Sequence, residues 1–395
     1  YTLMTFLTSI LLGLCMGSGA VFSIRFGQRD EERLKTSIFV SFVLIAAAAL
    51  VLNAAVFLFT DPIMAFLQVP DSIYGMMRDY LQVIFVGYMA VFVYNYFASL
   101  LRAVGNSVIP LLFLGISSLV NVGLDLVFVL VLKRGVAGAA EATVIAQFLS
   151  GMGIMAYTFL KMPEFRPGRQ NMHMNRDVIH EISQYSLLTC MQQSVMNFGI
   201  LMVQGLVNSF GTAVMAAFAA AVKIDSFAYM PVQDFGNAFS TFIAQNYGAG
   251  KRERIKKGIH SAAAVAVSFS LAVSAIVFIF ARELMLIFVN PSETEILEVG
   301  IKYLRIEGAF YCGIGCLFLL YGLYRAMGRP GMSVVLTVIS LGTRVVLAYT
   351  LSAVPWIGVT GIWVSVPVGW FLADAVGFLY YRYCSGKSLL QPQNG

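Results

Sequence analysis

Three polar side chains share one face of an apolar segment, the run SSLVNVGLDLVFVLVL at residues 117–132. Ser117, Asn121 and Asp125 are spaced four residues apart, so a helix would place them in one stripe. A charge in the middle of a bilayer costs about 3 to 10 kcal/mol, so such an acid normally faces a cavity or a partner. The stripe therefore predicts a site for a proton or for a coupling cation such as Na+. Elsewhere the sequence shows no pattern of zinc ligands, so we expect no site for a structural or catalytic metal. A structural alternative stays open, in which Asp125 neutralises a basic residue of another helix such as Arg344.

A second polar stripe occupies the segment 181–207. Gln193, Asn197 and Gln204 fall on one side of a helix with 100° per residue. Uncharged amides can hydrogen-bond varied solutes, and they can equally link helices within lipid. Both interpretations stay open.

The segment 213–247 carries further polar groups around Pro231. Lys223, Asp234 and Asn237 follow helical spacing along one face. A proline inside a membrane helix frees a carbonyl and bends the axis, so Pro231 is a candidate hinge. These residues, with Arg344 and the amides of 181–207, form the predicted substrate cavity.

The composition indicates the kind of scaffold that must position these groups. Of the 395 residues, 59% are hydrophobic and 12% are charged, whereas soluble domains carry about 25% charged residues. The mean hydropathy is +0.80, and a membrane-spanning helix needs about 20 apolar residues. Eleven segments meet this need: 2–25, 37–59, 74–101, 108–132, 137–160, 181–207, 213–247, 258–288, 296–324, 331–353 and 359–382. The fold class is an all-α polytopic membrane protein.

Basic residues gather in alternate loops, such as 25–35, 161–176 and 251–257. The positive-inside rule makes these loops cytoplasmic, and the net charge of +6 then reports topology and not a nucleic-acid partner. The sequence contains three histidines and no HExxH or GxSxG motif, so we expect neither an enzyme nor a bound cofactor.

The chain repeats itself. FGQRDEERLK at 26–35 matches YGAGKRERIK at 247–256 with an offset of 221, and LLRAVG at 100–105 matches LYRAMG at 323–328 with an offset of 223. Both copies place a basic loop on the same side, which indicates two like-oriented six-helix bundles. The predicted divisions are an N-terminal lobe at 1–160, a cytoplasmic linker at 161–180 and a C-terminal lobe at 181–395. The first lobe shows five of its six helices, so we expect one further helix before residue 1.

The repeat also bears on Asp125. The offset of 223 relates Asp125 to Ala348 and Asn121 to Arg344. The second lobe thus lacks an acid at this position, which favours a proton or ion site that belongs to the N-terminal lobe alone.

These motifs together resemble the multidrug and toxic compound extrusion (MATE) family along essentially the whole chain. The resemblance rests on the two basic loops, the turns LLRAVGNSVIP and LYRAMGRPG, the helix start GVAGAAEATVIAQ and the segment NVGLDLVFV. It implies twelve helices in two lobes and export of amphipathic or cationic organic compounds, driven by inward flow of H+ or Na+. One branch of the family carries an acid where this chain has Ile314, so the Na+ site of that branch is not expected here.

The sequence therefore predicts a monomeric antiporter of the plasma membrane that exports small organic compounds by alternating access. The alternatives are a lipid-linked oligosaccharide flippase of the same superfamily and a membrane protein without transport activity. A flippase would need several cationic residues for a pyrophosphate, whereas the deep basic residues here are mainly Lys223 and Arg344.

Overall fold

The structure is a computed structural model that describes residues 2–66 and 71–385. Every regular element in this part of the chain is a helix. Within residues 2–66 and 71–385, ten helices are long and apolar enough to cross a membrane, or eleven if the bent pair α12–α13 counts as one span. The prediction of an all-α polytopic membrane protein is confirmed.

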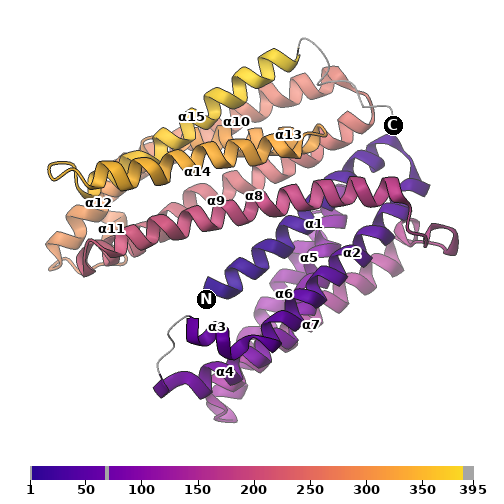
Figure 1. Ribbon diagram of the computed structural model, residues 1–395, viewed down its shortest axis with the longest axis horizontal. Coiled ribbons are helices and arrows are strands. Elements are labelled where there is room, and N and C mark those ends of the chain that lie inside the picture. The colour runs from indigo at the N-terminus through magenta and orange to yellow at the C-terminus, as the bar shows by residue number, and fades with distance from the viewer. Residues whose placement is uncertain (1, 67–70, 386–395) are drawn as a thin grey trace. The chain divides into compact units, whose positions relative to one another are not determined.

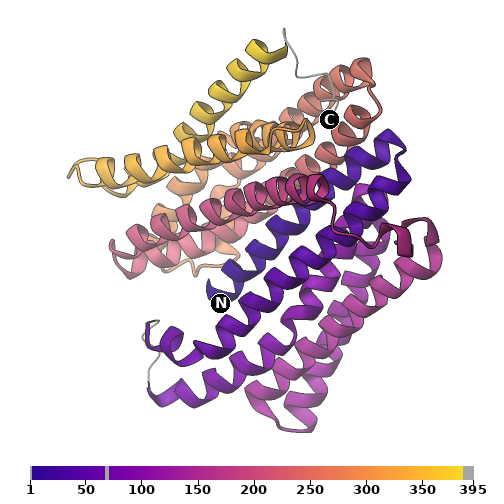
Figure 2. The ribbon, with the colours of Figure 1, turned by 45° about the vertical axis from the view of Figure 1, so that its right-hand side comes forward.

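The chain divides into two compact units, unit 1 at Tyr1–Cys190 and unit 2 at Met191–Gly395, each a bundle of long helices (Figures 1 and 2). The division falls within α8 (Arg176–Asn208), and residues 386–395 of the predicted C-terminal lobe lie outside the described residues. The other helices of unit 1 are α1 (Thr2–Gln28), α2 (Glu31–Leu58), α3 (Thr60–Phe66), α4 (Asp71–Val86), α5 (Tyr88–Ala103), α6 (Val108–Asp125), the π-helix η1 (Leu126–Val131), α7 (Gly135–Lys161), and the short 3₁₀ turns η2 (Pro163–Phe165) and η3 (Arg169–Asn171). Those of unit 2 are α9 (Thr212–Gly248), α10 (Arg252–Ile279), α11 (Ala281–Leu286), α12 (Thr294–Gly308), α13 (Tyr311–Ala326), α14 (Pro330–Ser352) and α15 (Val359–Ser385).

The sequence repeat reappears in the backbone of the turns. The amide of Asn106 donates to the Leu101 carbonyl at 2.8 Å, and 223 residues later the Arg329 amide donates to the Tyr324 carbonyl at 2.9 Å. Gly105 and Gly328 precede these amides with φ of 92° and 77°, a left-handed conformation that glycine adopts without steric cost. The same local sequence thus ends α5 and α13 in the same way.

Three predicted helices are interrupted, and the segment 258–288 divides at Phe280 into α10 and α11. The segment 74–101 divides at Gly87 into α4 and α5, and 296–324 divides at residues 309–310 into α12 and α13, which meet at a bend of 51°. Gly308 ends α12 where its Cα faces Val277, and a Cβ there would lie 2.9 Å from that side chain. Hydropathy cannot detect such a break, because apolar residues continue through it.

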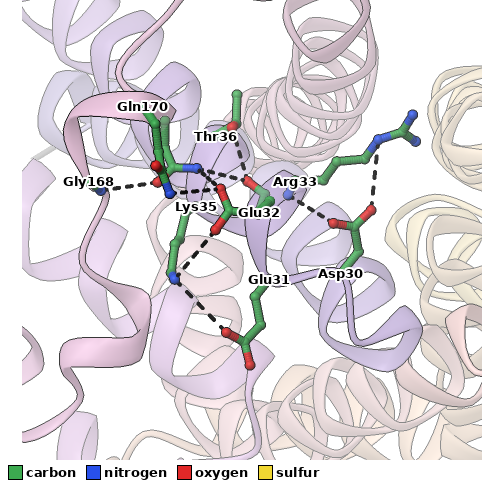
Figure 3. Close-up of polar contacts among 9 residues, drawn as sticks. Asp30, Glu31, Glu32, Arg33, Lys35, Thr36, Gly168 and Gln170 are labelled. Carbon is green, nitrogen blue, oxygen red and sulfur yellow. Dashed lines mark hydrogen bonds and ion pairs between the residues drawn. The ribbon is translucent and has the colours of Figure 1, made fainter.

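The predicted linker folds against the start of α2 within unit 1. Glu32 accepts hydrogen bonds from the Asn171 amide at 2.7 Å and the Gln170 amide at 3.4 Å, and Lys35 lies 3.9 Å from its carboxylate (Figure 3). Asn171 in turn accepts from the Gly168 backbone amide at 3.1 Å. Gln170 and Asn171 of the linker are therefore attached to α2 through one glutamate.

Candidate functional site

The polar stripe of unit 1 lies between α6 and α7. Ser117 donates to the Ala146 carbonyl at 2.9 Å, and the Asn121 amide donates to the Thr143 hydroxyl at 3.4 Å. Both partners belong to α7, so the stripe faces this helix as the spacing predicts.

Asp125 is the member of the stripe whose hydrogen bonding is incomplete. Its side chain is half-buried, and its Oδ1 atom is buried without a hydrogen-bond partner. No ion pair among the described residues of unit 1 includes it. Buried polar atoms are nearly always satisfied, so an unsatisfied carboxylate oxygen is a place where a proton or an ion could bind.

The helix changes its winding directly after Asp125. The α-helical pattern of α6 ends there and the chain continues as η1, in which the Leu132 amide donates to the Val127 carbonyl at 2.9 Å. The sequence predicts one uninterrupted helix to Leu132, so the π-helical segment is a difference from that expectation. Such wide turns are rare and often lie at functional sites.

The amides of α8 bond mainly within their own helix. Asn197 donates to the Gln193 carbonyl at 3.1 Å, and the Gln204 amide donates to the Asn208 side chain at 2.9 Å. Gln193, Asn197 and Gln204 are all half-buried. Because these bonds do not cross to another helix, they give no support to the alternative in which the amides link helices.

The polar residues of α9 divide into two groups. Lys223 and Asp234 are exposed on unit 2, with the Lys223 ammonium 5.6 Å from the centre of the Phe288 ring. Asn237 instead accepts a hydrogen bond from the buried guanidinium of Arg325 at 3.0 Å. The helix runs without a break through Pro231, so the hinge stays a prediction.

Unit 2 contains a buried acidic cluster that the site prediction did not include. Asp225 of α9 and Glu307 of α12 are 8% and 4% exposed. The Tyr303 hydroxyl is in hydrogen-bond contact with both acids, at 3.0 Å from Glu307, and the Tyr311 hydroxyl donates to Asp225. Arg344 of α14 acts electrostatically on both acids. The signal available in the sequence was the presence of two acids within spans, but nothing local showed that they meet.

Asp374 of α15 was also missed. It is half-buried, and its Oδ1 atom is buried without a hydrogen-bond partner. Within the described ranges, no group of three or more His, Cys, Asp or Glu residues has an arrangement that could hold a metal ion. A carboxyl group can bind a proton and, once ionised, can attract a cation.

Comparison with known sequences places this arrangement in a family. The sequence profile of the MatE family matches residues 1–127 and 173–350. The chain belongs to the MatE family. MatE proteins are membrane transporters of multidrug efflux, and the resemblance noted in the motifs is confirmed.

Individual relatives agree with this assignment. The chain is 27% identical to "Probable multidrug resistance protein YpnP" of Bacillus subtilis over 98% of this chain and 86% of that protein. It is 24% identical to an "FAD transporter" of Shewanella oneidensis, over 95% of this chain and 85% of that one.

Solved structures of MatE transporters share the fold. A MATE crystal structure in the bent conformation superposes with a TM-score of 0.90 at 22% identity, covering 96% of this chain and 85% of the other. An outward-facing transporter of the same family gives a TM-score of 0.89 at 22% identity with the same coverage. At this identity the likeness establishes the architecture alone.

Proposed function

We propose that this MatE transporter is a secondary antiporter of the plasma membrane. It exports amphipathic, mainly cationic organic compounds in exchange for H+ or Na+ by alternating access, with its basic loops in the cytoplasm. Asp125 carries the coupling ion, and Asn121 and Ser117 hold its helix against α7. The observation that carries the proposal is the buried, unpartnered Oδ1 atom of Asp125 at the junction with a π-helix.

Coupling follows from the two charge states of this side chain. A protonated Asp125 is neutral and fits the half-buried environment, whereas the carboxylate requires a cation or water in the same place. A proton or Na+ bound at Asp125 would therefore favour one conformation of unit 1 over another.

The substrate would bind to the polar groups of unit 2. Gln193, Asn197 and Gln204 supply hydrogen bonds, and Asp234 supplies a negative charge to attract a cation. Lys223, Asn237 and Arg344 complete the set and would position polar groups of the solute, and Pro231 would act as the hinge of α9. Exposure of Asp234 on unit 2 supports this assignment.

Efflux from vesicles tests the proposal. The full chain is reconstituted and efflux of a fluorescent organic cation is followed under an imposed H+ gradient or an imposed Na+ gradient. We expect Asp125→Asn to lower gradient-driven efflux at least about tenfold, equivalent to about 1.4 kcal/mol. The control is Glu31→Gln, which changes an exposed acid of unit 1 and should leave efflux unchanged. Full efflux by Asp125→Asn would refute the role of Asp125.

A further inference from the structure

In the acidic cluster of unit 2, one tyrosine hydroxyl contacts two carboxyl groups but has only one hydrogen to donate. The Tyr303 hydroxyl contacts the Oδ2 atom of Asp225 and lies 3.0 Å from the Oε2 atom of Glu307. A phenol has one hydrogen, so it can donate to only one of these acids. The other contact is a hydrogen bond only if the second acid carries a proton and donates to the phenol oxygen.

The remaining bonds are compatible with one additional proton. Tyr311 donates to the second carboxylate oxygen of Asp225. Asp225 can then be the carboxylate that accepts from two phenols, while Glu307 is the neutral acid that donates to Tyr303. The opposite arrangement, with the proton on Asp225, satisfies the Tyr303 contacts equally well. In either case, two acids share one proton through one hydroxyl.

The side chains around Asp225 and Glu307 favour the state in which the two acids hold one proton. Among the described residues, Arg344 of α14 is a basic side chain that attracts both acids, and α15 contributes the ring of Trp363, which packs against Tyr303. With one proton, the pair carries a single negative charge, which the Arg344 guanidinium attracts without forming a direct ion pair with either acid. Two buried carboxylates beside one arginine would leave an uncompensated charge in a medium of low polarity, which is costly.

Aromatic rings hold the shared hydroxyl in place. The Tyr303 ring packs edge-on against Trp363 at 4.8 Å and against Phe218 at 5.5 Å, and these two rings stack on each other. Tyr303 is 2% exposed, so water has little access to the bridge. The position of the Tyr303 hydroxyl is therefore fixed by packing as well as by hydrogen bonds.

The acidic cluster lies at the bend between α12 and α13, where a change in protonation could alter the backbone. Glu307 is in the last turn of α12 and Tyr311 is the first residue of α13, so the acid and its neighbour stand on the two sides of the 51° bend. Interrupted helices are places where transporters bind coupling ions, because the broken helix exposes backbone groups. Asp225 joins α9 to both halves of this helix.

The geometry leads us to propose that Asp225 and Glu307 form a proton-binding site in unit 2, separate from Asp125. One exchangeable proton is shared through Tyr303 and clamps α9 to the α12–α13 junction. Release of this proton to water leaves two carboxylates on one hydroxyl. Their repulsion then separates α9 from α12.

Infrared spectroscopy of the full chain in lipid nanodiscs at neutral pH tests this proposal without substrate or gradient. We expect the wild type to show the C=O stretch of one protonated carboxyl at this site. Both Glu307→Gln and Asp225→Asn should lose it, because an amide supplies the missing hydrogen. Retention of the full band in either variant would overturn the proposal.

Two further variants serve as controls for misfolding and for infrared bands that come from other carboxyl groups. Glu298→Gln changes an exposed acid on the same helix and should leave the band intact. Tyr303→Phe keeps both acids but removes their bridge, so the band should remain and shift in frequency. An unshifted band in Tyr303→Phe would also overturn the proposal. Because the readout does not require transport, its result is independent of the efflux measurement at Asp125.

Discussion

The two units share a backbone plan but place their acids at different positions. Unit 1 carries Asp125 where unit 2 has Ala348, and Asn121 where unit 2 has Arg344. The reverse holds at the broken helix, where Glu307 corresponds to Ile84.

The tyrosines around the broken helix are common to both units. Tyr303 corresponds to Tyr80 and Tyr311 to Tyr88, and by the offset of 221 Asp225 corresponds to Met4. In unit 1, Ile84 lies in an apolar cluster against which Met4 and Tyr80 pack. The helix junction can therefore be completed with apolar side chains.

This difference teaches that the acids are not required by the fold. Ile84 and Glu307 are equally inaccessible, at 5% and 4% exposure, yet only one of them is ionisable. Burial of an acid is unfavourable unless it is neutralised or hydrogen-bonded. Asp125 is present only in unit 1, and Glu307 is present only in unit 2. Since the other unit folds without the equivalent acid, this difference supports a functional role for Asp125 and for Glu307.

The largest effect should come from breaking the acidic cluster. Asp225→Met leaves Glu307, two phenols and Arg344 without their partner, and we expect unfolding to become easier by about 3 to 5 kcal/mol. Adding Glu307→Ile and Arg344→Asn produces the residues of unit 1 and should restore most of the stability, because uncharged side chains then replace both acids and the arginine and no buried charge is left without a partner. Thermal unfolding in nanodiscs measures both variants. If the triple variant is less stable than Asp225→Met alone, the side chains of unit 1 do not suit the junction of unit 2, and the two junctions are not equivalent.

A smaller effect should separate two tyrosines, Tyr303 from the junction of unit 2 and Tyr88 from the junction of unit 1. Tyr303→Phe removes a hydroxyl shared by two buried acids, and we expect a loss of stability of about 1 to 3 kcal/mol. Tyr88 donates one hydrogen bond to the Leu7 carbonyl at 2.9 Å, so Tyr88→Phe should cost about 1 kcal/mol. The same unfolding assay compares them. An equal loss in both variants would mean that the acids add nothing to the role of Tyr303.

The smallest effect concerns the loops at the start of α2 and α10. Glu32 binds the linker, whereas its counterpart Glu253 is exposed and contacts only Lys256, at 3.3 Å, among the ion pairs of the described residues. We expect Glu32→Ala to speed tryptic cleavage after Arg166 and Arg169 about threefold, since an exposed charged contact contributes less than about 1 kcal/mol. Glu253→Ala is the matched control and should leave this cleavage unchanged. Equal cleavage rates in the two variants would contradict the role of Glu32.

Local features of the sequence predicted much of this architecture. The membrane spans follow from runs of apolar residues, and the matched turns at Gly105 and Gly328 follow from hydrogen bonds within six residues. The stripe of Ser117 and Asn121 was predicted to share one face, and both residues do contact α7. These features depend on neighbours in the chain, so spacing alone can indicate them.

Other features depend on helices that are distant in the sequence. The bend between α12 and α13 and the π-helical segment after Asp125 lie in apolar sequence that also suits a straight helix. The exposure of Asp234 and the bond from Arg325 to Asn237 depend on which side of α9 faces its neighbours.

The sequence by itself determined that this chain is a membrane protein of duplicated helices, because composition and repetition are properties of the chain alone. It also determined that Asp125 has no acidic counterpart at Ala348. Only the tertiary structure decided that Asp225, Glu307 and two tyrosines meet in unit 2. Their hydrogen bonds join residues 78 and 86 positions apart, and such contacts exist only once the helices have packed.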